Sequence, residues 1–382
     1  MGRALRLLAA GLLVAAVVTL AWQPARVALQ TAALVPVVLG VDAGLGWLNA
    51  APRRETVAWR TAPDGSPDLG DLWVPPSADA ARPHGAILLV LGVNNVGRDY
   101  PAVVRLADGL ARMGVVVLVP DSRVLLAGRV DGGEITGVVT AFRYLAARPE
   151  VDPARVGMVG LSVGGALALL AAADPTIADE VRWVDAFGSF ADAGRYLASV
   201  MAGAYRGDDG APVAWQPAQL ARDVALGMLL DLVDDPDERG ALEAAYGPAV
   251  GTGERPTRDP TLRLETTAAQ AVERLLLARD LEAAEAAVRA LPAAARATLD
   301  ALTPAGHLDG LRARTFLMHD VSDAYVPYVE SRALAAELGA RAQLTEFRLF
   351  DHVEPKGVDL VGAAPEAWRL LWLVHAMLVE TL

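Results

Sequence analysis

The sequence predicts an α/β protein with a mostly parallel sheet of about eight strands, helices on both faces of the sheet and a long helical insertion. Three observations support this fold class. From residue 56 onward, short apolar runs alternate with amphipathic stretches of helical period, which is typical of parallel strands buried on both faces. A G-x-S-x-G sequence joins one of these runs to the next helix. The alternation stops for about 120 residues, which show only helical patterns, and then returns.

The first part of the predicted core covers residues 56–190. A run of aliphatic and β-branched residues between turn residues indicates a strand, whereas apolar residues spaced three and four apart indicate a helix. The expected strands are Thr56–Arg60, Leu69–Val74, Ala86–Leu91, Val115–Val119, Arg155–Val159 and Val181–Phe187. The expected helices are Tyr100–Met113, Gly133–Ala147 and Ser162–Ala173.

Residues 191–312 are expected to form a helical lid inserted into the core. Their Ala-rich stretches are similar to a coiled coil, but Gly and Pro interrupt them too often for long supercoiled helices. The core is expected to resume over residues 313–382. The elements expected there are strands Arg314–His319 and Leu344–Phe350 and helices Val326–Leu338 and Pro365–Leu382.

The composition excludes several function classes. The chain of 382 residues has no cysteine and a formal net charge of −12. Without cysteine there is no thiolate nucleophile, no disulfide framework and no Cys-ligated metal. The negative charge argues against a nucleic-acid partner, because the phosphate backbone attracts basic proteins. The acidic pairs Asp208-Asp209 and Asp234-Asp235 lie in predicted loops with no histidine nearby, so no metal and no other cofactor is expected.

Residues 1–55 are expected to direct the chain to a membrane. The first 60 residues have a formal charge of +4, which leaves −16 for the other 322. Leu7–Ala25 is uncharged over 19 residues and follows Arg3 and Arg6. This fits a spanning helix of about 20 residues or a cleaved signal peptide. No convincing small-x-small cleavage site precedes Trp22, so we expect an uncleaved anchor in the cell membrane.

A second apolar stretch, Val27–Leu48, is interrupted by Pro36 and Asp42. It fits a weak second span, an interfacial segment or a strip that covers the soluble domain. Two spans with arginines at both outer ends, including Arg53 and Arg54, would place both ends in the cytoplasm. A single anchor would place the domain outside, so the side of the membrane stays open.

The strongest chemical signal is Gly160-Leu161-Ser162-Val163-Gly164, between a predicted strand and a predicted helix. A sharp turn of this kind holds the central serine in a strained conformation, and its glycines allow other backbone to come close. Ser162 then lies at a helix N-terminus, where the N–H of Val163 can face a developing oxyanion. We therefore expect Ser162 to be a nucleophile rather than part of a plain glycine turn.

A nucleophilic serine needs a base and an acid that orients the base. In this architecture the chain order is serine, acid, histidine. Asp323, just past the strand Arg314–His319, is the preferred acid, and Asp320 is its rival. His352, on the loop after the last strand, is the preferred base. The other histidines precede a strand, lie in the lid, end a strand or lie within a helix: His84, His307, His319 and His375.

A second oxyanion donor is expected from the loop after the third strand, Leu91–Asp99. Gly92 permits a sharp turn there. The backbone N–H of Val93 is the preferred donor, and that of Asn94 is the next candidate.

These segments resemble the α/β-hydrolase superfamily, in particular its dienelactone-hydrolase and prolyl-peptidase-like serine hydrolases. DPARVGMVGLSVGGALALLAA resembles the family's nucleophile turn, and FLMHDVSDAYVPYVES resembles its acid loop, commonly H-G-x-x-D-x-x-V-P. On that pattern Asp323 takes the acid position, and Asp320 stands where glycine is usual. The resemblance covers residues 56–190 and 312–382 and implies an α/β-hydrolase fold. Dienelactone hydrolases use a cysteine nucleophile, so their substrate is not implied for a chain with Ser162.

The expected function is hydrolysis of an ester, thioester or amide through an acyl-enzyme formed by Ser162, His352 and Asp323. The substrate is expected to be a small acyl compound, and a membrane anchor favours a lipophilic one. Two alternatives remain: acyl transfer to an acceptor other than water, and a non-catalytic membrane-tethered binding protein on the same scaffold. The acyl group, the leaving group and the oligomeric state stay open.

Overall fold

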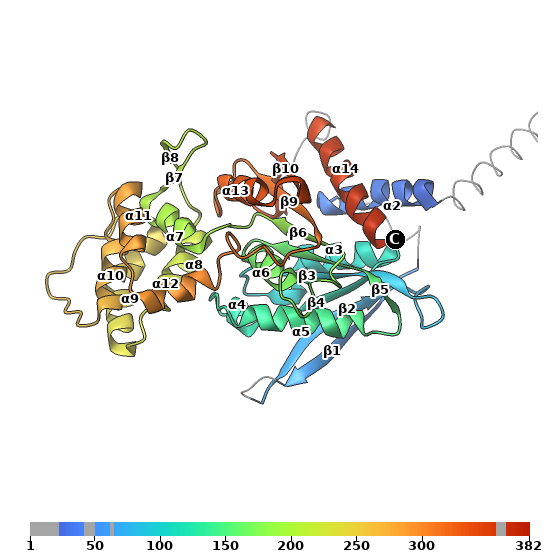
Figure 1. Cartoon of the computed structure of the whole chain (residues 1–382), viewed down its shortest axis with the longest axis horizontal. Coiled ribbons are helices and arrows are strands. Elements are labelled where there is room, and N and C mark those ends of the chain that lie inside the picture. Colours follow the sequence, from blue (N-terminus) through green and yellow to red (C-terminus); the bar gives the residue numbers. More distant parts are fainter. Residues whose placement is uncertain (1–22, 42–49, 62–64, 357–363) are drawn as a thin grey trace, which may run out of the picture.

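An eight-stranded sheet forms the centre of the molecule (Figure 1). The computed structural model describes residues 23–41, 50–61, 65–356 and 364–382. The strand order is β1-β2-β4-β3-β5-β6-β9-β10. β2 is antiparallel to both of its neighbours, and the remaining pairs are parallel. The strands are β1 (Arg53–Thr61), β2 (Pro67–Val74), β3 (His84–Val90), β4 (Val116–Pro120), β5 (Val151–Leu161), β6 (Trp183–Phe187), β9 (Arg314–Asp320) and β10 (Ala342–Phe347).

Helices cover both faces of this sheet. One face packs against α2 (Gln23–Val38), α3 (Pro101–Arg112) and α14 (Ala364–Thr381). The other face packs against α5 (Glu134–Ala146), α6 (Val163–Ala172) and α13 (Val329–Leu338). Shorter elements are α4 (Arg123–Leu126), the 3₁₀ turns η2 (Gly97–Asp99) and η3 (Gly339–Arg341), and the hairpin of β11 (Phe350–Asp351) and β12 (Glu354–Pro355). This is the α/β-hydrolase fold that the sequence predicts.

All eight predicted strands are present, in the predicted order, and the differences lie at their ends. The predicted strand Leu344–Phe350 ends at Phe347, and Phe350 begins the separate hairpin strand β11. The predicted helix Val326–Leu338 begins at Val329 instead. Pro327 disfavours a helical conformation at Val326, and the N–H of Val326 donates to the Asp323 side chain.

Six helices connect β6 to β9 and lie to one side of the sheet, at the left of Figure 1. Polar side chains cap several of their N-termini, for example Asp192, Asp235 and Asp280, which explains where these helices begin. The six are α7 (Ala193–Ala202), α8 (Gln219–Leu230), α9 (Pro236–Thr252), α10 (Thr267–Leu276), α11 (Leu281–Arg289) and α12 (Ala293–Asp300).

The expectation of an insertion without strands is wrong in one place. β7 (Ala204–Arg206) and β8 (Pro212–Ala214) form a small antiparallel hairpin between α7 and α8. Strands of three residues are too short to show an alternating pattern. Gly210, at the turn, has a φ of +79°, which favours glycine.

Part of the second apolar stretch, Val27–Leu48, lies in α2. This helix covers the sheet, which agrees with one of the three expectations for the stretch, a strip that covers the soluble domain. Val27, Leu34 and Val35 are buried, and the helix packs against α3 and α14. The first apolar run lies outside the described residues except for Gln23–Ala25. Within the described ranges, every helix falls short of the length and apolarity that crossing a bilayer requires.

The C-terminal end of α14 is held closely against the sheet. A Cβ on Gly85 of β3 would lie 1.8 Å from the carbonyl oxygen of Thr381, so only glycine permits this approach. The Thr381 hydroxyl accepts a hydrogen bond of 3.0 Å from the indole of Trp183. Arg155 donates to the carbonyl of Leu382 at 2.6 Å. These contacts fix the C-terminal end of α14 against the sheet.

Candidate active site

Ser162 lies at the sharp turn between β5 and α6. Its φ of +57° and ψ of −131° are unusual for a residue with a side chain. The turn is held by hydrogen bonds from the Ser162 N–H to the Phe187 carbonyl (2.7 Å) and from the Gly165 N–H to the Ser162 carbonyl (2.9 Å). The sequence expectation of a strained serine at this position is therefore correct.

Three glycines leave no room for a side chain around this turn. A Cβ on Gly160 would lie 2.4 Å from the Gly164 carbonyl oxygen, and one on Gly164 would lie 2.5 Å from the carbonyl oxygen of Val90. A Cβ on Gly92 would lie 2.7 Å from the Cβ of Ser162. The G-x-S-x-G spacing thus allows the turn, and Gly92 allows the neighbouring loop to approach the serine.

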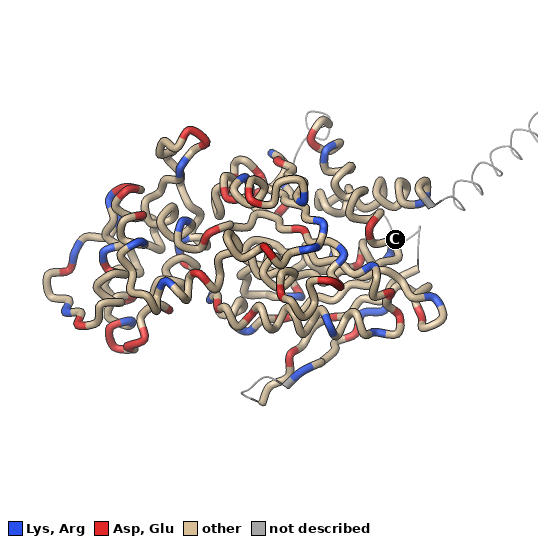
Figure 2. Tube along the Cα trace, in the orientation of Figure 1, with Lys and Arg blue, Asp and Glu red and all other residues tan. Residues whose placement is uncertain are grey.

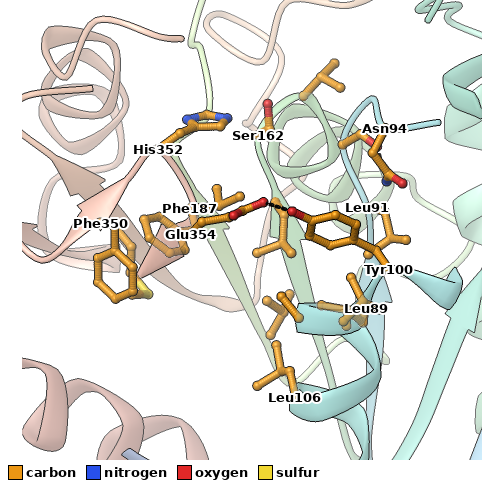
Figure 3. Close-up of a pocket in the computed structure, with 18 of the residues that line it drawn as sticks. Leu89, Leu91, Asn94, Tyr100, Leu106, Ser162, Phe187, Phe350, His352 and Glu354 are labelled. Carbon is orange, nitrogen blue, oxygen red and sulfur yellow. Dashed lines mark hydrogen bonds between the residues drawn. The ribbon is translucent and has the colours of Figure 1, made fainter. Parts of the chain in front are cut away.

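Asp323 and His352, 29 residues apart in the chain, meet at the carboxyl ends of β9 and β10. The Nδ1 atom of His352 lies 2.6 Å from Oδ2 of Asp323, and both side chains are buried. The Nε2 atom of His352 is buried and has no hydrogen-bond partner within the described part of the chain. Figure 3 shows His352 and Ser162 at the same end of a cavity.

The surroundings of Asp323 favour its charged form. Burial alone raises the pKa of this carboxyl, but the charge of His352 and hydrogen bonds from His319 and His352 outweigh burial and hold the pKa well below its ordinary range. Oδ1 also accepts from the N–H groups of Tyr325 (2.6 Å) and Val326 (3.0 Å). The carboxylate is therefore fixed in position and ionised at neutral pH.

Asp320, the rival acid, faces other groups. Its Oδ1 accepts from the N–H of Ser322 (2.9 Å) and lies 3.4 Å from Nζ of Lys356. Its Oδ2 accepts from the N–H of Phe350 (2.8 Å). Asp320 thus joins the acid loop to β11, and the partner of His352 is Asp323.

Backbone strain occurs at Ser162 and His352, two of the predicted catalytic residues. Among the described non-glycine residues, only Ser162 and His352 have positive φ, at +57° and +59°. Such conformations cost about 1–3 kcal/mol each and persist where the surrounding structure enforces them. Gly188 lies directly against the imidazole, because a Cβ there would be 2.8 Å from Cε1 of His352.

The two predicted oxyanion donors come from different elements. Val163 is the first residue of α6, so its N–H has no acceptor within the helix. Val93 lies on the loop after β3, and both valines line the cavity. The side chain of Asn94 is used within this loop: it accepts from the N–H groups of Val96 (3.1 Å) and Gly97 (2.5 Å).

The cavity has a volume of about 720 Å³, within the range of small-molecule sites. Ser162 and His352 lie at one end, and apolar side chains such as Leu89 and Leu106 lie below them (Figure 3). Tyr100 donates a hydrogen bond to Glu354 across this space. The insertion contributes lining residues from α7 and α8, including Tyr196 and Val224.

Sequence reasoning missed four residues of this site. Tyr325 stacks on the His352 ring with centroids 4.7 Å apart, and the Trp215 indole donates to the Asp323 carbonyl at 3.0 Å. Neither residue carries a sequence signal, because both contacts depend on how the insertion and the acid loop pack. Gly188 lies directly after β6, and in the sequence it is indistinguishable from any glycine at the end of a strand. Asp185 did carry a signal, since it is an acid in the middle of the apolar strand WVDAF.

The other histidines have structural partners. His319 is buried and lies between the Ser331 hydroxyl (2.7 Å) and the Val326 carbonyl (3.0 Å), with Nε2 3.4 Å from Asp323. His84, His307 and His375 contact Gly114, Thr303 and Thr31, respectively. Across the described ranges, no three His, Asp or Glu side chains form a group suited to a metal ion.

No protein-family model matches the sequence, and no curated protein is similar to it. Many solved structures match it, and three of them are described below. A 2,6-dihydroxy-pseudo-oxynicotine hydrolase is 16% identical, over 86% of this chain and 69% of its own, with a TM-score of 0.47. Dipeptidyl peptidase 4 of Porphyromonas gingivalis is 13% identical, over 84% of this chain and 35% of its own, with a TM-score of 0.48.

The third is a dienelactone hydrolase from Anabaena variabilis. It is 15% identical, over 87% of this chain and 99% of its own, with a TM-score of 0.44. The chain spans about a third of the dipeptidyl peptidase but nearly the whole dienelactone hydrolase. At TM-scores below 0.5, these likenesses say nothing about what this chain acts on.

Proposed function

We propose that the chain is a serine hydrolase that cleaves a carboxylic ester through an acyl-enzyme. The observation that supports this proposal is the strained Ser162 at the same end of the cavity as the His352 ring, whose Nδ1 atom lies 2.6 Å from the Asp323 carboxylate. A nucleophile, a base and an acid that orients the base form the arrangement needed for acyl transfer.

In the first half of the reaction, Nε2 of His352 takes the proton from Ser162 Oγ, and Oγ bonds to the acyl carbon. Asp323 holds the ring by Nδ1 and stabilises the imidazolium that forms. The N–H groups of Val163 and Val93 would stabilise the oxyanion, and each such donor is worth about 10²–10³ in rate. His352 then gives its proton to the leaving alcohol, and the acyl group stays on Ser162.

In the second half, His352 takes a proton from water, and the hydroxide attacks the acyl carbon. Collapse of the second tetrahedral intermediate breaks the bond to Oγ, which regains the proton from His352. The products are the free acid and the starting enzyme. The apolar cavity below Ser162 supports an apolar acyl group over a charged one.

Covalent labelling tests the nucleophile. A fluorophosphonate probe should label the full chain, and Ser162→Ala should abolish labelling. The exposed Ser77→Ala is the matched control and should be labelled like the wild type. Equal absence of labelling in the wild type and Ser162→Ala would contradict the enzyme and favour the binding-protein alternative. Pairs of p-nitrophenyl esters and p-nitroanilides of one acid would separate esterase from amidase activity.

Paired carboxylate variants test the acid. Asp323→Asn should lower kcat about 10⁴-fold, the loss seen when an acid no longer fixes the tautomer of its histidine. Asp320→Asn should cost far less activity, because that side chain contacts Ser322, Phe350 and Lys356 rather than His352. The proposal assigns the wrong acid if the two losses are reversed.

Acyl transfer uses the same residues as hydrolysis and differs only in the acceptor. Product analysis with and without added alcohols and amines decides between the two. For a hydrolase, we expect the amount of free acid formed per ester consumed to stay the same whatever acceptor is added.

We also propose that the chain is held at a membrane. The apolar run Leu7–Ala25 precedes α2, and α2 packs on α14. On α14, Trp368, Trp372 and Val379 lie on one helical stripe and are 59%, 52% and 52% exposed. Figure 2 shows α2 almost free of charged residues. Exposed tryptophans on an amphipathic helix suit the membrane interface.

Alkaline extraction of membranes from expressing cells tests this attachment. The full chain should stay in the membrane, and a chain that begins at Gln23 should be released. Vesicle binding by the shortened chain should fall when Trp368 and Trp372 are both replaced by Ser. A mature protein that lacks the first residues would instead support the signal-peptide alternative.

A further inference from the structure

The cavity below Ser162 runs between the sheet and the helices α2, α3 and α14. Its lining includes Leu89 and Val159 from the sheet, Leu106 from α3 and Leu34 from α2. Val159 and Leu161 stand on the central strand β5, yet both are only half-buried. A side chain at the middle of a covered sheet stays accessible only where the covering helices leave a space. The accessibility of Val159 therefore reflects this cavity.

The paired residues of β5 and β6 form successive rows along the cavity. Leu161 pairs with Phe187, Val159 with Asp185, and Gly157 with Trp183. Successive rows on one face are two residues apart, or roughly 6–7 Å. The first row adjoins Ser162. In the third row the Trp183 ring lies over Gly157, where a Cβ would be 2.2 Å from it, so Trp183 forms the floor.

Asp185 is the one acid that the eight-stranded sheet contributes to the lining of this space, and the β11–β12 hairpin adds Asp351 and Glu354. It is 2% exposed, and its Oδ1 has no hydrogen-bond partner in the described ranges. Burial raises the pKa of this carboxyl well above its ordinary value, which favours its neutral form. A neutral carboxyl can donate one hydrogen bond and accept another. A buried group of this kind normally has a partner.

We propose that the cavity holds the acyl chain of the substrate and that the Asp185 carboxyl hydrogen-bonds a hydroxyl group carried partway along that chain. This inference rests on the proposed function and names its substrate class, the esters of hydroxylated aliphatic acids. The hydroxyl lies away from the ester carbonyl, because the Asp185 row is roughly 6–7 Å below the row that adjoins Ser162. A hydroxyl matches the carboxyl in both roles, whereas an ammonium group requires an ionised partner.

A panel of esters tests this assignment on the full chain. The panel holds p-nitrophenyl esters of one straight-chain length, either unsubstituted or with a single hydroxyl at successive carbons. We expect one or two adjacent internal positions to raise kcat/KM about 10- to 100-fold over the unsubstituted ester, the effect of satisfying one buried polar group. No preferred internal position would overturn the inference.

Two variants of Asp185 separate the hydrogen bond from the shape of the cavity. Asp185→Leu should lose the preference for the hydroxyl, so that the ratio of kcat/KM for hydroxylated and unsubstituted esters falls to about one. Asp185→Asn, which can still donate and accept, should keep part of the preference. An unchanged preference in Asp185→Leu would overturn the inference. The inference would also be overturned if the wild type preferred chains with an amino group to chains with a hydroxyl and both variants lost this preference. That result would indicate an ionised carboxylate.

Binding to the Ser162→Ala chain distinguishes failure of this inference from failure of the proposed function. Calorimetry with the free hydroxy acid and its unsubstituted counterpart needs no catalysis. The inference is supported if Ser162→Ala binds the hydroxy acid more tightly than the unsubstituted acid and the double variant with Asp185→Leu does not. This holds even if the wild type cleaves no ester and is not labelled at Ser162. Normal labelling and ester cleavage without this difference would overturn the inference and leave the hydrolase in place. Urea unfolding at neutral pH checks that each variant is folded.

Discussion

At the scale of single residues, the candidate site depends on conformations that few side chains adopt. Ser162 and His352 have positive φ, and Gly188 provides the close approach that the imidazole needs. The Asp323 carboxylate is held by two backbone N–H groups and by His352, and Nε2 of His319 lies 3.4 Å from it. Each group therefore has a fixed position before any substrate binds, which is the condition for efficient acyl transfer.

Gly188→Ala is expected to reduce activity more than stability. Its new Cβ would meet the His352 ring at 2.8 Å, at a φ of +63°, and would displace the base. A shift of about 1 Å lowers kcat about 10²-fold. Gly306→Ala is the matched control, with a φ of +78° and no atom within 4 Å of its Cβ. Both variants should lose about 1–2 kcal/mol of stability, and ester hydrolysis by Gly306→Ala should stay normal.

Asp185→Asn is expected to stabilise the protein, and more so at higher pH. The folded-state pKa of Asp185 is raised by burial. Below the ordinary carboxyl pKa, both folded and unfolded chains are protonated and the group contributes nothing. Between the ordinary pKa and the raised one, only the unfolded chain releases the proton, so stability falls as pH rises. Asparagine removes this loss.

Urea midpoints measured between about pH 4 and pH 8 test this sign. The advantage of Asp185→Asn over the wild type should grow with pH, whereas the exposed Asp309→Asn should show little change. A constant difference across the range would mean that Asp185 ionises alike in both states. Asp323 acts in the opposite direction: its lowered pKa gives stability that is lost as pH falls to strongly acidic values.

At the scale of elements, the sequence predicted most of the fold because strands and helices have their own periods. The inner strands β3, β4, β6 and β9 are apolar runs with nearly every residue buried. The order of all eight sheet strands along the chain was readable. The hairpin of β7 and β8 was not predicted, because three-residue strands have no period to detect. The late start of α13 follows from Pro327 and the Asp323 carboxyl, a tertiary contact that competes with helix formation.

The packing of α14 on β3 gives a prediction at this scale. Gly85→Ala would place a Cβ 1.8 Å from the Thr381 carbonyl oxygen, so the end of α14 must move. We expect a loss of about 1–3 kcal/mol and a looser cavity floor, since Thr381 also holds Trp183. The control is Gly137→Ala in α5, where nothing lies within 4 Å of the Cβ.

Gly137→Ala should instead gain about 0.5–1 kcal/mol, because alanine favours the helix interior. Chemical denaturation of the two variants beside the wild type measures both changes. Equal stability of all three proteins would show that the α14 contact with β3 is not as close as described.

At the scale of the whole molecule, α2 connects the N-terminal region to the α/β core. Its buried side chains, including Val27, Leu34 and Val35, cover one face of the sheet together with α3 and α14. The N-terminal region therefore has two parts by sequence: a run of anchor-like composition up to about Ala25, and a helix that belongs to the core.

Truncation separates these two parts. A chain that begins at Gln23 should retain the wild-type midpoint of unfolding in urea. A chain that begins at Ala50 exposes the surface that α2 covers and should lose roughly 1.5–3 kcal/mol for each fully buried aliphatic side chain removed. It should also lose selectivity for acyl chains, because Leu34 lines the cavity. Equal stability of the two chains would show that α2 contributes nothing to the core.

The sequence by itself determined the order of the strands along the chain, the sharp turn at Ser162 and the chain order of the candidate nucleophile, acid and base, because these depend on local periodicity and turn geometry. It left Asp323 and Asp320 as alternatives, since both lie on one loop and only the approach of β10 and β11 decides which carboxyl meets His352. The cavity and the unpartnered Asp185 also required the tertiary structure. A space inside a protein arises where side chains from distant segments fail to meet, and no local pattern records that.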